Sequence, residues 1–201
     1  MKPLLPPLAL AVALAMAFVA GCASTPATRY HSLLSTDAAS ARDAGLPPLP
    51  VHLAAVRVPA SVDQQQWVVR LGDDSLRVLE GEQWVSPLRD ELHAALFERL
   101  AQRYAAVDAR SVPGQPALRV TVEVQRFESI AGKEVWLDSL WSAQADGAKT
   151  VALLCRSSLR EPAAGELPAL AAAHRRAVVR LADQIGSQLL ALANGAGTRC
   201  P

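Results

Sequence analysis

The sequence lacks the short motifs by which many enzymes are recognised. It contains no Gly-x-Ser-x-Gly nucleophile elbow, no phosphate-binding loop and no Gly-x-Gly-x-x-Gly fingerprint. Its four histidines stand apart, without the two-His or Cys-His spacing of a zinc site. Two of them, His93 and His174, fall inside expected helices beside charged neighbours, which favours surface positions for both. We therefore expect no catalytic residues, no bound metal and no cofactor.

The chain also lacks an excess of charge of either sign. Lysine and arginine together number 20, against 19 aspartates and glutamates, and the formal net charge is +1. The arginines are scattered among carboxylates and do not form the basic stripe that nucleic-acid binding requires. We therefore exclude nucleic acid as a partner.

An apolar run long enough to cross a membrane is missing from the N-terminal segment. The run over residues 8–20 is shorter than the roughly 20 apolar residues that a spanning helix needs, and several prolines precede it. A single early positive charge, Lys2, followed by a short apolar run is typical of a secretory signal. We expect residues 1–21 to be a signal peptide.

The segment closes with Val19-Ala20-Gly21-Cys22, where a small residue stands directly before a cysteine. This is the cleavage pattern of bacterial lipoproteins, so we expect Cys22 to become the first mature residue and to carry acyl chains. The alternative is an ordinary signal peptide with a coincidental cysteine. The residues that follow, Ala23 and Ser24, offer no aspartate to retain the protein at the inner membrane. The pattern therefore favours the periplasmic face of the outer membrane.

Cysteine is scarce, with three in the whole chain. Besides Cys22, only Cys155 and Cys200 remain, and in an oxidising periplasm such a pair predicts a disulfide. The long loop that it closes would stabilise the fold by roughly 4 kcal/mol in the chain-entropy description. The alternative is two independent thiols, one buried in a strand and one in a C-terminal tail.

The remaining sequence divides into a tether and one domain. Residues 22–29 form the lipidated tether, because residues 23–29 are small or polar and have no apolar period. Seven residues reach at most about 25 Å, so the folded body must lie close to the lipid surface. Residues 30–201 suit a single domain.

Apolar periodicity within this domain predicts both helices and strands. Leucines every four residues after Ser86-Pro87 indicate a first amphipathic helix, and a second runs from Pro168 to Asn194-Gly195. Expected strands or short β runs are 30–34, 51–58, 67–71, 76–79, 118–124, 135–141 and 151–157. The pattern predicts an α+β, two-layer sandwich: a five- to six-stranded, mostly antiparallel sheet with both helices on one face.

Tryptophans mark the region between Pro59 and Pro87. One ends the polar run Asp63-Gln64-Gln65-Gln66-Trp67, and another ends Glu80-Gly81-Glu82-Gln83-Trp84. Because tryptophan is a favoured anchor at interfaces, this region is a predicted docking edge for a partner. The predicted docking residues are Asp63, Gln64, Gln65, Trp67, Arg70 and Trp84. The alternative is that Trp84 caps the core.

A further pair, Trp136 and Trp141, has odd spacing within one expected strand. Their side chains should therefore point to opposite faces of the sheet. One of the two is expected to lie off the main core, under a loop or at an interface.

Several segments resemble one known family, the auxiliary lipoproteins of ABC-type transport systems that work between two membranes. The resembling segments are Tyr30-His31-Ser32-Leu33, Val56-Arg57-Val58-Pro59, the run from Asp63 to Arg70, Trp84-Val85-Ser86-Pro87-Leu88, and Val120-x-Val-x-Val followed by Phe127. The resemblance implies a non-enzymatic accessory subunit of an MCE-type lipid transport system. It further implies as partners a tunnel-forming MCE-domain protein and inner-membrane transport subunits, with homo-oligomer formation left open.

Two other functions stay open at this point. One is an envelope lipoprotein that activates or scaffolds a cell-wall enzyme, although such proteins usually need a longer linker than residues 23–29 provide. The other is a carrier of apolar molecules, which would need an apolar cavity of several hundred Å³. A chain of this size with two packed helices is expected to fill its core instead.

Overall fold

The computed structural model describes residues 27–34, 45–72, 74–149 and 151–201. The predicted signal peptide, the predicted lipidation site at Cys22 and most of the predicted tether lie outside these residues.

Two long helices carry the apolar stripes that the sequence predicts. Helix α2 spans Leu88–Tyr104 and helix α3 spans Leu167–Ala193. The first buries leucines at four-residue spacing, Leu88, Leu92, Leu96 and Leu100, and ends at Ala105 in the left-handed conformation. In the described residues, no helix is both long and apolar enough to cross a bilayer.

A single mixed sheet of eight strands is formed by the described residues. One side of it is an antiparallel meander of three long strands, β6, β7 and β8, with β8 at the edge. The other strands join the free side of β6 in the order β6-β3-β4-β1 and β6-β2-β5. The strands are β1 (Arg29–His31), β2 (Leu49–Leu53), β3 (Gln66–Arg70), β4 (Leu76–Trp84), β5 (Ala106–Asp108), β6 (Leu118–Ile130), β7 (Glu134–Ala145) and β8 (Leu153–Pro162).

The sheet corrects the expectation of five to six mostly antiparallel strands. Strand β1 pairs with β4 in parallel, and β2 pairs in parallel with both β5 and β6. Both β1 and β5 are three residues long, too short to show an alternating pattern in the sequence. The parallel pairing of β2 with β5 follows from a crossover through the β3–β4 hairpin and α2. The α+β class itself is confirmed.

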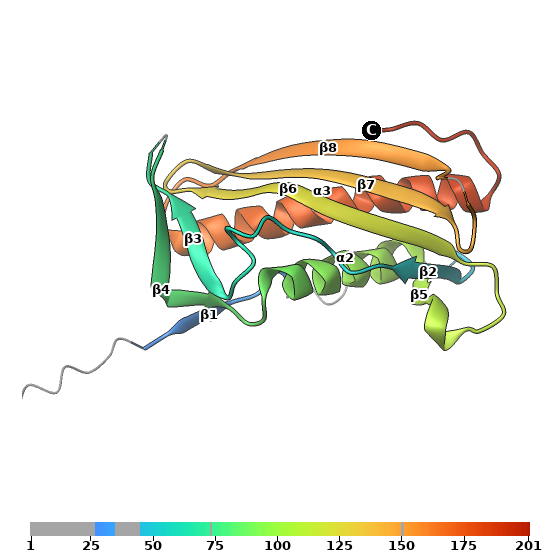
Figure 1. The fold of residues 1–201 in the computed structure, drawn as a ribbon, viewed down its shortest axis with the longest axis horizontal. Coiled ribbons are helices and arrows are strands. Elements are labelled where there is room, and N and C mark those ends of the chain that lie inside the picture. Colours follow the sequence, from blue (N-terminus) through green and yellow to red (C-terminus); the bar gives the residue numbers. More distant parts are fainter. Residues whose placement is uncertain (1–26, 35–44, 73, 150) are drawn as a thin grey trace, which may run out of the picture.

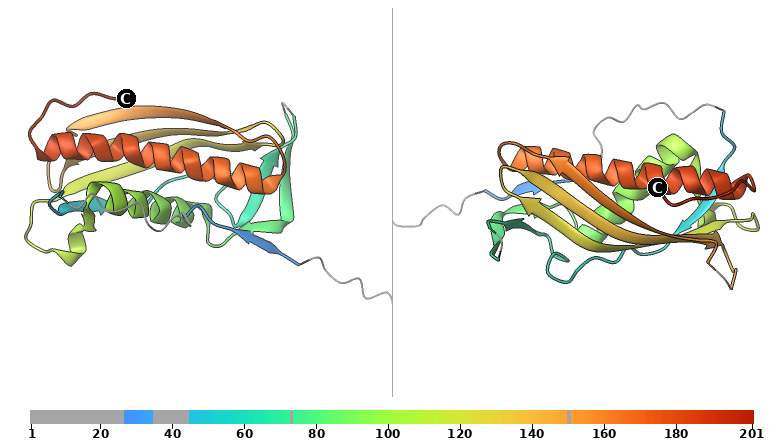
Figure 2. Two further views of the ribbon diagram at one scale, coloured as in Figure 1. Left: turned by 180° about the vertical axis from the view of Figure 1, so that it is seen from behind. Right: turned by 90° about the horizontal axis from the view of Figure 1, so that it is seen from above.

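Both helices cover one face of the sheet and lie side by side (Figures 1 and 2). Helix α3 runs along β6, β7 and β8, while α2 lies next to it over β2 and β5. We call the opposite side, on which no helix of the described residues lies, the outer face. The hairpin of β3 and β4 stands across one end of the molecule, and β1 lies at that same end.

The predicted disulfide is confirmed: Cys155 and Cys200 are bonded, with their Cα atoms 5.3 Å apart. Cys155 is buried on β8, and Cys200 belongs to the tail that follows α3. The bond therefore fastens the C-terminal tail to the edge strand of the sheet.

Candidate partner-docking groove

An open groove lies between α2 and the extended segment of residues 51–56. Its volume is about 640 Å³. The leucines of α2 form a stripe that faces the core, so the side of the helix next to this stripe faces the groove. Arg89, His93 and Phe97 lie on that side of the helix at four-residue spacing. Ala94 and Glu98 complete the helical wall.

The opposite wall is the continuation of β2. Main-chain hydrogen bonds from Ala54 N to Val120 O (2.9 Å) and from Arg57 N to Val122 O (3.1 Å) hold this segment against β6. Strand β5 pairs with β2 only as far as Val51, so the residues beyond it border the groove. The apolar floor is built from Val51, Leu53, Ala55 and Val56, of which Ala55 is exposed.

Charged side chains in the rim are paired with each other. Arg89 Nη1 donates to Asp63 Oδ2 at 2.7 Å, and Arg110 Nη2 lies 2.6 Å from Asp108 Oδ2. Hydrogen bonds from the side chain and main chain of Arg110 lower the pKa of Asp108 to about 2. His93 Nε2 lies 3.2 Å from the Leu53 carbonyl, which ties the two walls together. The groove thus combines an apolar floor with a charged rim, to which Asp90 and Glu98 of α2 add two further carboxylates.

The structure brings one residue of the predicted docking set, Asp63, to this groove. Asp63 reaches the rim through its ion pair with Arg89, and Gln64 and Gln65 follow it on the same loop. Gln65 is exposed, and its amide lies 3.5 Å from the Val85 carbonyl. Phe97, Arg89 and residues 51–56 were not predicted as site residues. For Arg89 and Phe97 the signal in the sequence is the four-residue spacing that they share with His93 beside the leucine stripe, whereas residues 51–56 have no such signal.

Both predicted anchor tryptophans lie in the core. Trp67 is 1 % exposed and Trp84 is 2 % exposed, with ring centroids 4.6 Å apart. Side chains alternate between the two faces along β3 and β4, and both indoles point to the inner face, toward α3. They are therefore core residues and not surface anchors. The prediction that Trp67 and Trp84 are exposed docking residues is therefore corrected. For Trp84 the position agrees with the alternative, in which it caps the core.

Next to these indoles lies His174, whose predicted surface position is wrong. It is fully buried, stacks on Phe127 with ring centroids 4.0 Å apart, and its Nε2 lies 2.8 Å from Ser129 Oγ. The same hydroxyl accepts a hydrogen bond from Trp67 Nε1 at 2.8 Å. Burial lowers the pKa of His174 to about 3, so the ring is neutral at ordinary pH. Its spacing from Leu170 and Val178 in the α3 stripe was the missed signal.

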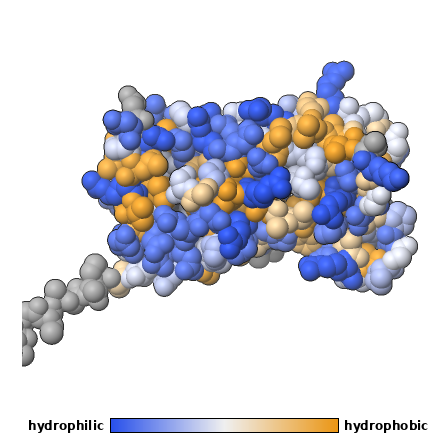
Figure 3. Space-filling view, viewed as in Figure 1, coloured by the Kyte–Doolittle hydropathy of each residue, from blue (hydrophilic) through white to orange (hydrophobic). Residues whose placement is uncertain are grey.

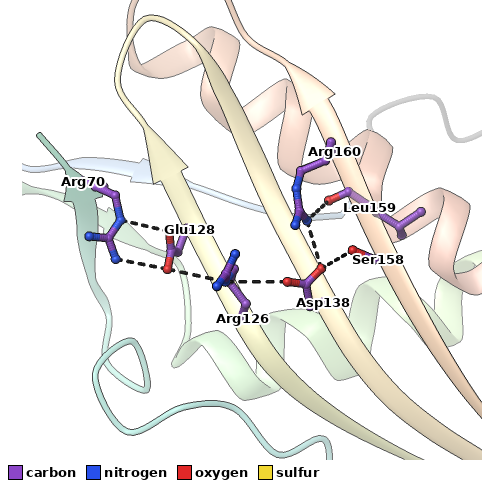
Figure 4. Close-up of polar contacts among 7 residues, drawn as sticks. All are labelled: Arg70, Arg126, Glu128, Asp138, Ser158, Leu159 and Arg160. Atoms are coloured by element: carbon purple, nitrogen blue, oxygen red, sulfur yellow. Dashed lines mark hydrogen bonds and ion pairs between the residues drawn. The ribbon is translucent and has the colours of Figure 1, made fainter. Parts of the chain in front are cut away.

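Arg70, the last predicted docking residue, lies away from the groove in a row of charges on the outer face (Figure 4). Its guanidinium pairs with Glu128 of β6 at 2.9 Å, and Arg126 links Glu128 to Asp138 of β7 at 3.7 and 3.6 Å. Arg160 of β8 closes the row, 2.9 Å from Asp138. The row therefore crosses β3, β6, β7 and β8.

Trp136 is enclosed within this row of charges. The guanidinium carbons of Arg126 and Arg160 lie 4.8 and 4.4 Å from the centroid of its indole ring. Trp141 of the same strand is buried in the core, so the prediction that one of the two lies off the core is confirmed. Burial would raise the pKa of Asp138, but hydrogen bonds from Arg160 and Ser158 and the nearby Arg126 charge hold it below its usual value. The charged groups of the row are thus paired with one another, which gives it the character of a structural network.

The described part of the chain contains no group of three or more histidine, cysteine or acidic side chains that could hold a metal ion.

Taken together, a three-stranded meander, two helices on one face and a groove flanking α2 define a class of α+β domain. The chain belongs to the family described as ABC-type transport auxiliary lipoprotein component, whose sequence model matches residues 31–186. The match runs from the end of β1 into α3 and includes both walls of the groove.

Solved structures share this fold at low sequence identity. The crystal structure of an uncharacterized protein has a TM-score of 0.65 at 16% identity, covering 81% of this chain and 99% of its own. A protein from Xanthomonas campestris has a TM-score of 0.64 at 16% identity, covering 84% of this chain and 98% of its own. Identities this low establish the fold alone. No curated protein matches the chain.

Proposed function

We propose that the chain is a non-enzymatic accessory lipoprotein of an MCE-type intermembrane lipid transport system, anchored to the periplasmic face of the outer membrane. The observation that carries this proposal is the family match over residues 31–186, which spans nearly the whole described fold. The lipoprotein pattern ending at Cys22, with Ala23 and Ser24 after it, supports the outer membrane as the site of anchorage.

In this proposal the acyl chains on Cys22 hold the body at the membrane, where two or more chains give a stable attachment. The body then binds the MCE-domain tunnel protein and, through it, the inner-membrane transport subunits. Energy supply and the tunnel belong to those other subunits.

The groove along α2 is the proposed contact with that partner. An apolar floor beside a half-buried phenylalanine, Phe97, suits the apolar side chains of a peptide segment, and the paired charges of the rim suit its polar groups. The groove is open along the surface, whereas carriers of apolar molecules enclose most of their ligand. The alternative of a ligand carrier therefore receives no support from it.

Site-specific photo-crosslinking in intact cells tests this contact. A photoreactive residue is placed at Gln65, which is exposed two residues after the rim residue Asp63, with the exposed Leu154 of β8 as control. We expect crosslinks from position 65 to an MCE-domain protein and none from position 154. Crosslinks from position 65 to a peptidoglycan synthase would contradict the transport role and favour the cell-wall alternative.

A further inference from the structure

The first strand of the fold is fixed to the root of the β3–β4 hairpin. Arg29 and His31 both bind Glu82 of β4, with distances of 2.7 Å from Arg29 Nε to Oε1 and 2.6 Å from His31 Nε2 to Oε2. Glu82 is buried, and hydrogen bonds from His31 and Arg29 outweigh the effect of burial and lower its pKa. Leu33 N also donates to the buried Glu91 of α2 at 2.9 Å. The point at which the chain enters the fold is therefore rigidly placed.

This point of entry lies close to the predicted anchor in sequence. Arg29 follows Cys22 by seven residues, which span at most about 25 Å even when fully extended. The start of β1, at the hairpin end of the molecule, must then lie within that distance of the lipid surface to which Cys22 is attached.

Exposed apolar side chains are concentrated at this same end. Eight large apolar side chains are exposed in the described residues, and six of them belong to β1, to the hairpin or to the first three residues that follow these elements. The six are Tyr30, Leu34, Leu71, Leu76, Val78 and Val85. Figure 3 shows apolar residues gathered over β3 and β4 at this end. Single exposed apolar residues are ordinary, but a cluster beside a lipid anchor marks a contact surface.

We propose that the side of the β3–β4 hairpin carrying Leu76 and Val78, together with Leu71 and Tyr30, rests on the lipid bilayer beside the acyl anchor. This second contact fixes the orientation of the body on the membrane. It goes beyond the accessory role proposed above and rests on the lipidation of Cys22.

The charges around the patch indicate how it contacts lipid. Arg29 and Arg77 are exposed, but so are Asp74 at the hairpin turn and Glu80 on β4. The local charge is balanced, so attraction to anionic lipids contributes little and the contact is apolar. Because the hairpin turn carries the exposed Asp74, contact through the side of the hairpin is favoured over insertion of the tip into the bilayer.

The test uses the lipidated chain in phosphatidylcholine vesicles that contain brominated phosphatidylcholine. With Cys22 acylated and Cys155 bonded to Cys200, a Val78→Cys variant offers one free thiol for an environment-sensitive fluorophore. Val151→Cys, at a similarly exposed valine two residues before β8, is the matched control. We expect bromine to quench the label at 78 severalfold more strongly than the label at 151, with no dependence on salt.

A second pair of variants tests whether Leu76 and Val78 themselves hold the hairpin on the bilayer or only lie near it. A label at Leu71→Cys should lose most of its quenching when Leu76 and Val78 are both replaced by serine, and keep it when Val151 and Leu154 are replaced instead. All of these side chains are exposed, so the substitutions leave the core intact.

Three results would overturn the proposal. If the protein floats with the vesicles while both labels stay in water, the hairpin contact is wrong and the accessory role is untouched. If the acylated protein does not float, the anchorage fails as well. If the label at 78 is shielded only after envelope proteins are added, the patch is a protein interface and not a lipid contact.

Discussion

Residue 186 of α3 is a glycine, and the ring of Tyr104 of α2 packs directly on the helix backbone at this position. A Cβ atom at position 186 would overlap the Tyr104 ring. The contact is reinforced by the Tyr104 hydroxyl, which donates to the Asp183 carbonyl at 3.1 Å, and by Arg99, which pairs with the Asp183 carboxylate at 2.8 Å. This cluster positions α2, and with it one wall of the groove.

Gly186→Ala is therefore expected to destabilise the fold although alanine is the better helix former. Displacing a packed ring costs about 1–3 kcal/mol, against a gain of about 1 kcal/mol in helix propensity. The urea midpoint should fall, whereas Ser187→Ala, on the exposed side of the same turn, should leave it nearly unchanged. An unchanged midpoint for both variants would contradict the close approach.

Buried His174 predicts a pH dependence of stability. Its ordinary pKa of 6.5 falls to about 3 in the folded protein because burial disfavours the charged ring. Between these values the unfolded chain binds a proton that the folded chain does not. Stability is therefore complete above pH 6.5 and falls as the pH drops, by about 1.4 kcal/mol per pH unit.

His174→Gln removes this titration while offering Ser129 a polar partner. The decline in unfolding free energy between pH 6.5 and pH 4 should be shallower in the variant by about 1.4 kcal/mol per unit. Carboxylates with lowered pKa values, such as Glu82 and Glu161, are common to both proteins and cancel in the difference. Parallel pH profiles for the two proteins would refute the assignment.

At the scale of elements, long regular segments could be predicted from the sequence and short ones could not. The leucine stripe of α2 and the strict alternation along β6 are strong local signals. Strand β5 has no such signal, because three residues beside a crossover are defined only by tertiary pairing. The inward turn of Trp67 and Trp84 likewise depends on which face of the hairpin meets the core.

The candidate site also contains residues that the sequence predicts and residues that only the structure identifies. Asp63, Gln64 and Gln65 were predicted from composition, and Asp63 does lie at the groove. The groove itself arises where β2 continues past its last pairing with β5 and faces the flank of α2. No local pattern encodes that meeting of two segments, so Phe97 and residues 51–56 required the structure.

The link between the tail and β8 gives a prediction at this scale. In a chain lacking Cys22, denaturation without reductant should expose no free thiol, since Cys155 and Cys200 are bonded. Replacing both by serine should lower the unfolding free energy by about 4 kcal/mol, from the 45-residue separation in the chain-entropy description. Two titratable thiols in the unreduced chain would contradict the bond.

Over the whole molecule, the two proposed surfaces are compatible with simultaneous use. The hairpin and β1 occupy one end, and the groove extends along α2 toward β5 at the other end (Figure 1). A body resting on its hairpin end therefore leaves the groove accessible to a partner. The two anchors, acyl chains and hairpin, would limit how far the groove can turn away from that partner.

Affinity purification of the lipidated chain from mildly solubilised envelopes tests the central claim most directly. Ala55→Arg fills the groove from an exposed position, and Ala148→Arg, exposed in the turn after β7, is its matched control. The account predicts that wild-type and Ala148→Arg protein recover an MCE-domain partner, and that Ala55→Arg recovers severalfold less. Recovery of no transport component by the wild-type chain, or equal recovery by all three proteins, would contradict it.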